Sequence, residues 1–421
     1  MPSASVILPW LFLAVPGVAG VSAVVQARLS GSPGPVRQFL VTCITGSMLG
    51  VGVGVWYSKL LHERVPPLQV LITCGLATAV MFLMKALNRA LAWGIGRAMP
   101  KGTQGQPCCP AADTFAKVAR AGLLLALGVP FVAGMVLTYR PRVVHPGTPT
   151  SMLGWAYEDV SFSATDGMPL RGWWIPAGRS ARTDERHPGP PWGAQTVILC
   201  HGFGADKAVD LRLARDLVPN GYNVLAFDFR AHGESGGQFT TFGDLERRDV
   251  LGAVRWARAT HPAETRKVFG LGESMGAAAL ISAAADTGAE GQAIDAVAVF
   301  APFDRLTELF QGMAEMNYAP AGGWLARRVA LPAAGLELGA DLTHFEPGRD
   351  VQALWPRPLL VISAEQNESP AAGRTRELFD EALQPKYLLR IDKGGRDAVL
   401  FASKRASLAL RVFFGGARQI L

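Results

Sequence analysis

Gly272-Glu273-Ser274-Met275-Gly276 is the stretch of sequence that decides the fold. The short apolar run at residues 267–271 precedes it, and a run of small residues at 277–281 follows it. A strand, then G-x-S-x-G, then a helix is the context of a nucleophile elbow, in which a serine lies on a sharp turn. The flanking glycines permit a backbone conformation that a Cβ would obstruct. Ser274 is therefore the predicted nucleophile.

The sequence around this pentapeptide alternates between strand and helix patterns. Strands are predicted at 157–164, 169–175, 196–200, 223–227, 267–271, 296–300, 358–362 and 387–391, and helices at 211–217 and 245–260. Such alternation predicts an α/β protein with a mostly parallel sheet that is covered by helices on both faces. An insertion at 304–355 is a candidate cap over the site.

The first third of the chain has a different composition. The chain is 421 residues long and 49% hydrophobic, and its apolar excess is concentrated near the start. Four runs without Asp, Glu, Lys or Arg lie at 5–25, 39–56, 68–84 and 121–138. Each approaches the ~20 residues needed to cross a bilayer. We therefore expect an all-α membrane region of about four helices at residues 1–140, a linker at 141–154, and the α/β domain at 155–421.

Basic residues between the apolar runs predict the orientation. Lys and Arg are more numerous in the first and third connections (Arg28 and Arg37; Lys85, Arg89, Arg97, Lys101, Lys117 and Arg120) than in the second connection or after the fourth run (Lys59 and Arg64; Arg140 and Arg142). Positive charge favours the cytoplasmic side of a membrane. We expect a multi-pass membrane protein with both termini, and hence the C-terminal domain, on the non-cytoplasmic side.

Charge and cysteine usage exclude several partners. The net charge of +7 is explained by the residues that flank the apolar runs. No basic cluster interleaved with aromatic residues appears elsewhere, so no nucleic-acid surface is expected. The five cysteines form neither a disulfide framework nor a metal-binding pattern. No metal and no cofactor are predicted.

Three further motifs accompany the elbow in a fixed order. They are Asp-Gly-Met-Pro-Leu-Arg-Gly-Trp at 166–173, Cys-His-Gly-Phe-Gly at 200–204 and Asp-Phe-Arg-Ala-His-Gly-Glu-Ser at 228–235. With these motifs, residues 155–415 resemble the α/β-hydrolase superfamily, and within it the membrane-anchored serine aminopeptidase-like and ABHD-type branch. The resemblance implies that the backbone N–H groups of Phe203 and Met275 stabilise an oxyanion. It also implies structural roles for His201 and His232.

The chain departs from this family at the other two triad positions. Where the family has a catalytic aspartate after the strand at 358–362, this sequence has Asn367. Where the family has a catalytic histidine after the last strand, this sequence has Arg396. A serine hydroxyl needs a base to take its proton, and arginine stays protonated in proteins. The sequence therefore predicts an incomplete triad.

Three hypotheses follow from this combination. The first is an active membrane-bound serine hydrolase of esters, thioesters or amides, in which another residue serves as the base; the candidates are His344, His201, Asp397 and Glu368. The second is a pseudoenzyme that uses the pocket, the oxyanion donors and Ser274 to bind a ligand or partner. The third makes the membrane helices the functional part. The residues present favour the second over a competent triad, and membrane placement makes lipids and acylated molecules candidate ligands.

Overall fold

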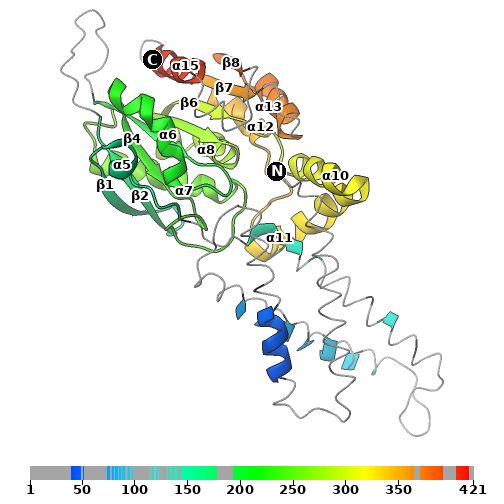
Figure 1. Cartoon of the computed structure of the whole chain (residues 1–421). Helices are drawn as coiled ribbons and strands as arrows, with labels where there is room; N and C mark the ends of the chain where they lie inside the picture. Colours follow the sequence, from blue (N-terminus) through cyan, green and yellow to red (C-terminus); the bar gives the residue numbers. More distant parts are fainter. Residues whose placement is uncertain are drawn as a thin grey trace, which may run out of the picture. The chain divides into compact units, whose positions relative to one another are not determined.

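The chain forms two compact units, at residues 1–137 and 138–421 (Figure 1). The computed structural model describes residues 39–48, 144–177, 193–364, 370–391 and 404–416, together with scattered residues between 51 and 139. In the first unit, residues 39–48 are helical and contact a helical stretch near residue 82. The ring centroids of Phe39 and Phe82 are 5.4 Å apart, and the Thr45 hydroxyl lies 3.4 Å from the Met81 sulfur.

The structure does not support the predicted membrane region. Among the described residues, no helix is both long enough and apolar enough to span a bilayer. The predicted span at 5–25 lies entirely outside the described residues, and so do many residues of the other three predicted spans. The expectation of about four membrane helices therefore stays a prediction.

The second unit is built around one eight-stranded sheet. Its strands are β1 (Glu158–Ser163), β2 (Pro169–Ile175), β3 (Gln195–Cys200), β4 (Asn223–Phe227), β5 (Lys267–Glu273), β6 (Ile294–Phe300), β7 (Leu359–Ala364) and β8 (Lys386–Ile391). They lie in the order β1-β2-β4-β3-β5-β6-β7-β8. Strand β2 is antiparallel to β1 and β4, and the other neighbours are parallel. This confirms the predicted mostly parallel sheet.

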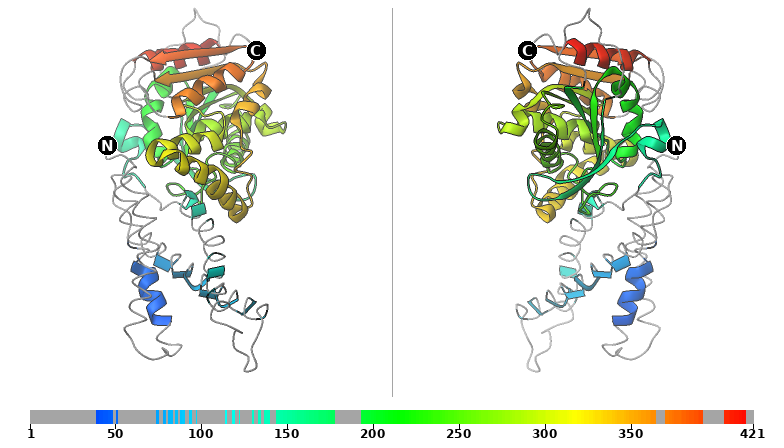
Figure 2. Two further views of the ribbon diagram at one scale, coloured as in Figure 1. Left: turned by 90° about the vertical axis from the view of Figure 1, so that its right-hand side faces the viewer. Right: turned by 90° about the vertical axis from the view of Figure 1, so that its left-hand side faces the viewer.

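Helices cover both faces of the sheet (Figure 1). They are α5 (Pro149–Leu153), α6 (Lys207–Leu217), η2 (Val218–Asn220), α7 (Glu246–Thr260), α8 (Met275–Ala285), α9 (Ala289–Gln292), α10 (Leu306–Leu325), η3 (Ala326–Ala330), α11 (Leu331–Leu338), α12 (Pro347–Asp350), η4 (Val351–Leu354), α13 (Pro370–Glu381) and α15 (Lys404–Gly416). Helices α6 and α15 share one apolar cluster with the strands, and Figure 2 shows α15 in red beside β8. Helices α7 and α8 pack against each other. Helix α7 also contacts β1, β3 and β4, and α8 contacts β3, β5 and β6.

The central strands explain why the sheet is covered on both sides. Every residue of β3 and β4 is buried, so both of their faces need a covering layer. On one of these faces, Gly270 of β5 lies so close to Leu280 of α8 that a Cβ would overlap its side chain. This close approach seats α8, the helix that follows Ser274, directly on the sheet.

The second unit begins before the predicted domain boundary. The Thr240 N–H donates to the Thr138 carbonyl at 2.9 Å, and Tyr139 forms a β-bridge with Phe239. The His145 N–H donates to the Asp206 carboxylate at 2.8 Å. Helix α5 then packs against α6. Where it is described, the segment that we expected to be a linker at 141–154 is thus held on the domain.

Candidate active site

Ser274 lies on the sharp turn between β5 and α8. Its backbone angles are φ 51° and ψ −112°, a conformation that residues with a Cβ rarely adopt. Such strain costs roughly 1–3 kcal/mol and persists where the surrounding structure imposes it. The Ser274 N–H donates to the Phe300 carbonyl of β6 at 2.9 Å, which holds the turn against the sheet. The sharp strand-to-helix turn that the sequence predicts at Ser274 is therefore present.

The two glycines of the elbow are explained by close backbone approach. A Cβ on Gly272 would lie 2.7 Å from the Gly276 carbonyl oxygen. A Cβ on Gly276 would overlap the carbonyl group of Cys200 at the end of β3. Both positions therefore exclude side chains, and the start of α8 can lie against the end of β3.

The serine is accessible, although its neighbours are not. Ser274 is half-buried, whereas Glu273 and Met275 are buried. The Met275 N–H lies in the first turn of α8, where N–H groups have no partner within the helix. Phe203 lies three residues beyond the end of β3. Convergence of the Phe203 and Met275 N–H groups on one oxyanion stays a prediction.

An aromatic series leads from the predicted oxyanion loop to the insertion. The ring of Phe203, 38% exposed, lies 4.9 Å from the ring of Phe242. Phe242 in turn lies 4.8 Å from Phe310 of α10. Sequence reasoning missed this series because the three residues are far apart in the chain. It gives the region between Phe203 and the insertion an apolar wall.

His201 and His232 have structural hydrogen bonds. The His201 Nδ1 lies 2.9 Å from the Gly202 carbonyl, and its Nε2 accepts from the Phe229 N–H at 3.0 Å. Burial lowers the pKa of His201, so the ring is neutral at pH 7. The His232 Nδ1 lies 2.9 Å from the Arg230 carbonyl. These contacts hold loops together, and they occupy both ring nitrogens of His201.

His344 pairs with a carboxylate of its own loop. Its side chain is 77% exposed, and its Nδ1 lies 3.0 Å from Asp341. Elsewhere, His145 pairs with Asp206, and the ring of His261 stacks on Trp174 at 4.0 Å. In the part of the chain that the structure describes, no histidine is hydrogen-bonded to the Ser274 hydroxyl.

The other two triad positions lie outside the described residues. Asn367 and Glu368 follow the end of β7, and Arg396 and Asp397 follow the end of β8. Strands β5 to β8 are parallel neighbours, so their carboxyl ends meet at one edge of the sheet. That edge also carries Ser274. The assignment of Asn367 and Arg396 to the acid and base positions stays a prediction.

Asp304 is a buried carboxylate at the same edge that sequence reasoning missed. It lies just beyond β6, it is 1% exposed, and neither of its carboxylate oxygens has a hydrogen-bond partner among the described residues. Its nearest cations, Arg374 and Arg305, are 3.9 and 4.0 Å away. Burial raises the pKa of Asp304 to about 6. Its position directly after a predicted strand was the one signal in the sequence.

The motif at 228–235 takes part in two largely buried ionic clusters. Asp228 accepts from the Lys207 ammonium at 2.6 Å and from the Lys207 N–H at 2.8 Å. Arg230 donates to Asp249 of α7 at 2.6 Å and to Asp166 of the β1–β2 turn at 2.9 Å. Buried charges are stable only when they are paired in this way. The motif therefore positions loops around the site and supplies no base.

The sheet order and the strand-turn-helix at Ser274 define a class of protein, the α/β-hydrolase fold. The chain is 24% identical to the esterase Pf2001 of Pyrococcus furiosus, with a TM-score of 0.51 over 66% of this chain and 98% of that one. This similarity shows the fold alone.

Comparison with protein families narrows the assignment. Residues 193–347 match the Hydrolase_4 family, serine aminopeptidase S33. The chain is also 26% identical to the uncharacterized protein YfhR of Escherichia coli K12, over 57% of this chain and 73% of YfhR. It is 26% identical to the uncharacterized protein YqkD of Bacillus subtilis, over 58% of this chain and 78% of YqkD. These similarities support the α/β-hydrolase fold of the second unit.

Proposed function

We propose that the second unit binds ester, thioester or amide ligands at Ser274 and hydrolyses them slowly because the conventional base is absent. The observation that carries this proposal is the strained backbone at Ser274 (φ 51°, ψ −112°). Strain of this kind is costly to keep, and it places a hydroxyl at the tip of a turn above a helix N-terminus. A site of purely structural importance does not need it.

The reaction would follow the order of acyl transfer to serine. The Ser274 oxygen attacks the carbonyl carbon, and the N–H groups of Phe203 and Met275 stabilise the oxyanion as it forms. The hydroxyl proton must leave during this attack, which normally requires a neighbouring histidine; that proton then goes to the alcohol, thiol or amine that leaves, and water hydrolyses the acyl-serine. Arg396 cannot accept this proton, and Asn367 cannot stabilise an imidazolium. Oxyanion stabilisation alone leaves about 10³-fold acceleration over water.

Ligand binding without turnover is the second candidate function. It is favoured by the engagement of His201, His232 and His344 in hydrogen bonds that do not involve Ser274. Under this alternative, the elbow and the apolar wall at Phe203 and Phe242 would hold an acyl group or a partner.

Labelling with a fluorophosphonate probe separates the two functions. We expect the full chain in detergent to label slowly at Ser274 and the Ser274→Ala variant not to label. Folding of both proteins is checked by their melting temperatures. Complete absence of labelling in folded wild-type protein would support binding alone. Rapid labelling that is lost in His344→Ala would show that a histidine of the insertion is the base.

Restoration of the triad tests the assignment of the degenerate positions. The double substitution Asn367→Asp with Arg396→His is expected to raise hydrolysis of an activated ester by about 10²-fold or more, since a general base contributes that much. Each single substitution should do less than the pair because triad members act as a unit. The matched control is Arg376→His on α13. No gain in the double variant would show that these positions are not the triad positions.

We further propose that residues 1–140 anchor the domain in a membrane through about four helices. The four uncharged apolar runs support this anchor, and the basic residues between them support a non-cytoplasmic domain. Such an anchor would place Ser274 near lipids and acylated molecules. Alkaline phosphatase fused to the C-terminus should be active in a bacterial host if the domain is exported. An inactive phosphatase, together with a fluorescent cytoplasmic reporter at the same position, would reverse the orientation.

A further inference from the structure

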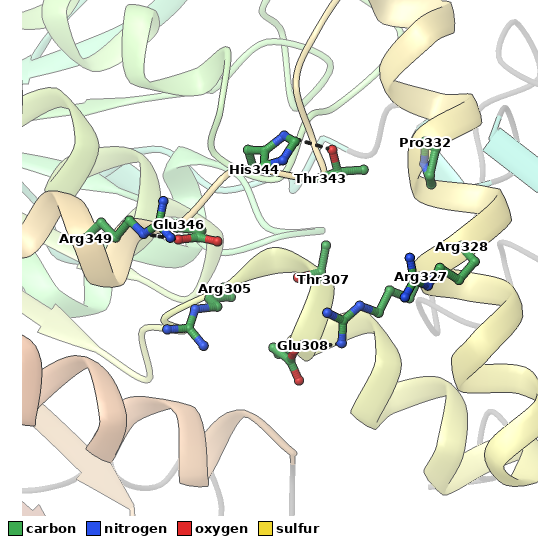
Figure 3. Close-up of a pocket in the computed structure, with 10 residues that line it drawn as sticks. All are labelled: Arg305, Thr307, Glu308, Arg327, Arg328, Pro332, Thr343, His344, Glu346 and Arg349. Carbon is green, nitrogen blue, oxygen red and sulfur yellow. Dashed lines mark hydrogen bonds and ion pairs between the residues drawn. The ribbon is translucent and has the colours of Figure 1, made fainter.

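A pocket of about 610 Å³ lies in the insertion between β6 and β7. It is lined by residues at the start of α10, in η3 and α11, and in α12 and the segment that leads into it (Figure 3), and its charged side chains include Arg305, Glu308, Arg327, Arg328, Glu346 and Arg349. Its volume lies within the range of small-molecule sites. Ser274 and its neighbours are not among the lining residues, so this pocket is separate from the elbow.

The pocket is positively charged. Its four arginines exceed its two glutamates, which leaves two formal positive charges even when His344 is neutral. Figure 3 shows Arg305 and Arg349 on one side of the pocket and Arg327 and Arg328 on the other. Both glutamates pair with arginines, and Glu308 also lies 3.5 Å from Arg374, which is outside the lining. Glu308 binds Arg327 at 2.9 Å, and Glu346 binds Arg349 at 2.5 Å.

Two arginines retain binding capacity. Arg328 is exposed and has no carboxylate partner among the described residues. Arg305 is only loosely paired, at 3.5 Å to Glu381 and 4.0 Å to Asp304. Each guanidinium has five N–H donors in a planar arrangement that matches phosphate oxygens. Arg305 and Arg328 therefore present donors to the pocket that no group of the described residues satisfies fully.

The helix geometry at Arg328 is unusual. Residues Ala326–Ala330 form a π-helical turn between α10 and α11. Turns of this kind are rare in helices, and they frequently occur at functional sites. This turn contains both Arg327 and Arg328. It therefore determines where their side chains leave the helix, and both reach the pocket.

We propose that this pocket binds the phosphate group of an organic phosphate ester. The two excess positive charges match a phosphate dianion, which has more acceptor oxygens than the singly charged carboxylate. The inference goes beyond the proposed function because binding here requires no reaction at Ser274. A soluble phosphate ester and an anionic lipid headgroup share this chemistry, and the experiment distinguishes them.

Calorimetric titration of the full chain in detergent with phenyl phosphate tests the proposal. Saturable binding at one site is expected, both in the wild type and in Ser274→Ala. The substitutions Arg328→Gln and Arg305→Gln should each weaken binding about tenfold because each removes a charge-assisted hydrogen bond. The matched control is Arg258→Gln, an exposed arginine of α7 outside the pocket, which should bind as the wild type does.

Three outcomes would overturn the proposal. They are the absence of saturable binding, equal weakening by Arg258→Gln, and binding of phenylacetate as tight as that of phenyl phosphate. None of them affects the fluorophosphonate result, so failure here is distinguishable from failure at Ser274. All variants change exposed or half-buried side chains, and their melting temperatures check folding.

A second titration identifies the source of the phosphate. Didecanoyl phosphatidic acid is added to the micelles, with didecanoyl phosphatidylcholine as the zwitterionic control. Tighter binding of phosphatidic acid than of phenyl phosphate, lost in Arg328→Gln, would assign a lipid headgroup. The reverse order of affinity, with the same dependence on Arg328, would assign a soluble phosphate ester.

Discussion

The proposed function depends on single residues at the carboxyl edge of the sheet. Ser274 keeps a strained backbone, whereas Gly272 and Gly276 remove the side chains that would block that turn. Such a strained turn is expected if the hydroxyl is used and is unnecessary if it is not. By contrast, the sequence has Asn367 and Arg396 where the family has its catalytic acid and base, and this assignment stays a prediction.

The backbone strain at Ser274 predicts that the conformation needed for function lowers the stability of the folded protein. The substitution Ser274→Gly should relieve the backbone strain, whereas Ser274→Ala should keep it. The greater conformational freedom of glycine in the unfolded chain offsets part of this gain in stability. We expect the glycine variant to be more stable than the alanine variant by about 1 kcal/mol, measured by thermal unfolding. An alanine variant of equal or greater stability would show that the turn is not strained.

Asp304 predicts a pH dependence of stability. Its pKa is about 6 in the folded chain, above the ordinary value of 3.8, because the carboxylate is buried. The folded state therefore binds the proton more tightly than the unfolded state does. The free energy of unfolding should fall as pH rises from about 4 to about 6, since the charged form is destabilising when buried.

The substitution Asp304→Asn tests this dependence. Above pH 6 it should stabilise the protein by up to about 2 kcal/mol, and near pH 4 it should have little effect. Asp341→Asn, which changes an exposed carboxylate on the same insertion, is the control. Melting temperatures measured from pH 4.5 to 7.5 would contradict the prediction if the wild type and Asp304→Asn differed by a constant amount.

At the scale of elements, the π-helical turn has a local cause in the sequence. Pro332 is the second residue of α11, and it has no N–H to donate to the carbonyl of Arg328 four residues earlier. The proline ring also crowds that carbonyl. A widened turn at 326–330 accommodates both effects. Pro332 thus links the helix geometry to the position of Arg328 at the pocket.

Restoring a regular helix should therefore weaken phosphate binding. Pro332→Ala supplies the missing N–H and permits α-helical hydrogen bonds through the turn. The melting temperature should stay the same or rise, and the dissociation constant for phenyl phosphate should increase at least about threefold as Arg328 moves. Leu336→Ala, an exposed position on the same helix, is the control. Unchanged binding by Pro332→Ala would separate the turn from the site.

The strands could be predicted because their signals are local. The predicted strands at 169–175 and 223–227 match β2 and β4 to the residue, since apolar runs bounded by turn residues mark both ends. The position of Ser274 on a sharp turn was also predicted, because the two glycines of the motif indicate a turn in which side chains would clash with the backbone. Asp304 and the series Phe203, Phe242 and Phe310 were missed, because their roles depend on contacts between distant segments.

On the scale of the whole molecule, the chain divides into two units at a defined point in the sequence. The first compact unit ends at Leu137, and the second begins at Thr138. The second unit includes Tyr139, which is buried, and His145, whose N–H is bound by Asp206. From the sequence alone we placed the start of the domain at residue 155, because the pattern of strands and helices begins only after Trp155. Bridges such as Tyr139 to Phe239 leave no periodic signal.

This boundary predicts the outcome of truncation. A chain that begins at Thr138 should fold without the first unit, because it keeps the Thr138, Tyr139 and His145 contacts. A chain that begins at Leu153 loses these contacts and the start of α5, and burial of the Tyr139 ring alone contributes about 1.5–3 kcal/mol. Its melting temperature should therefore be several degrees lower. Equal melting temperatures would show that residues 138–152 do not belong to the domain, and failure of the longer chain to fold would show that the domain depends on residues 1–137.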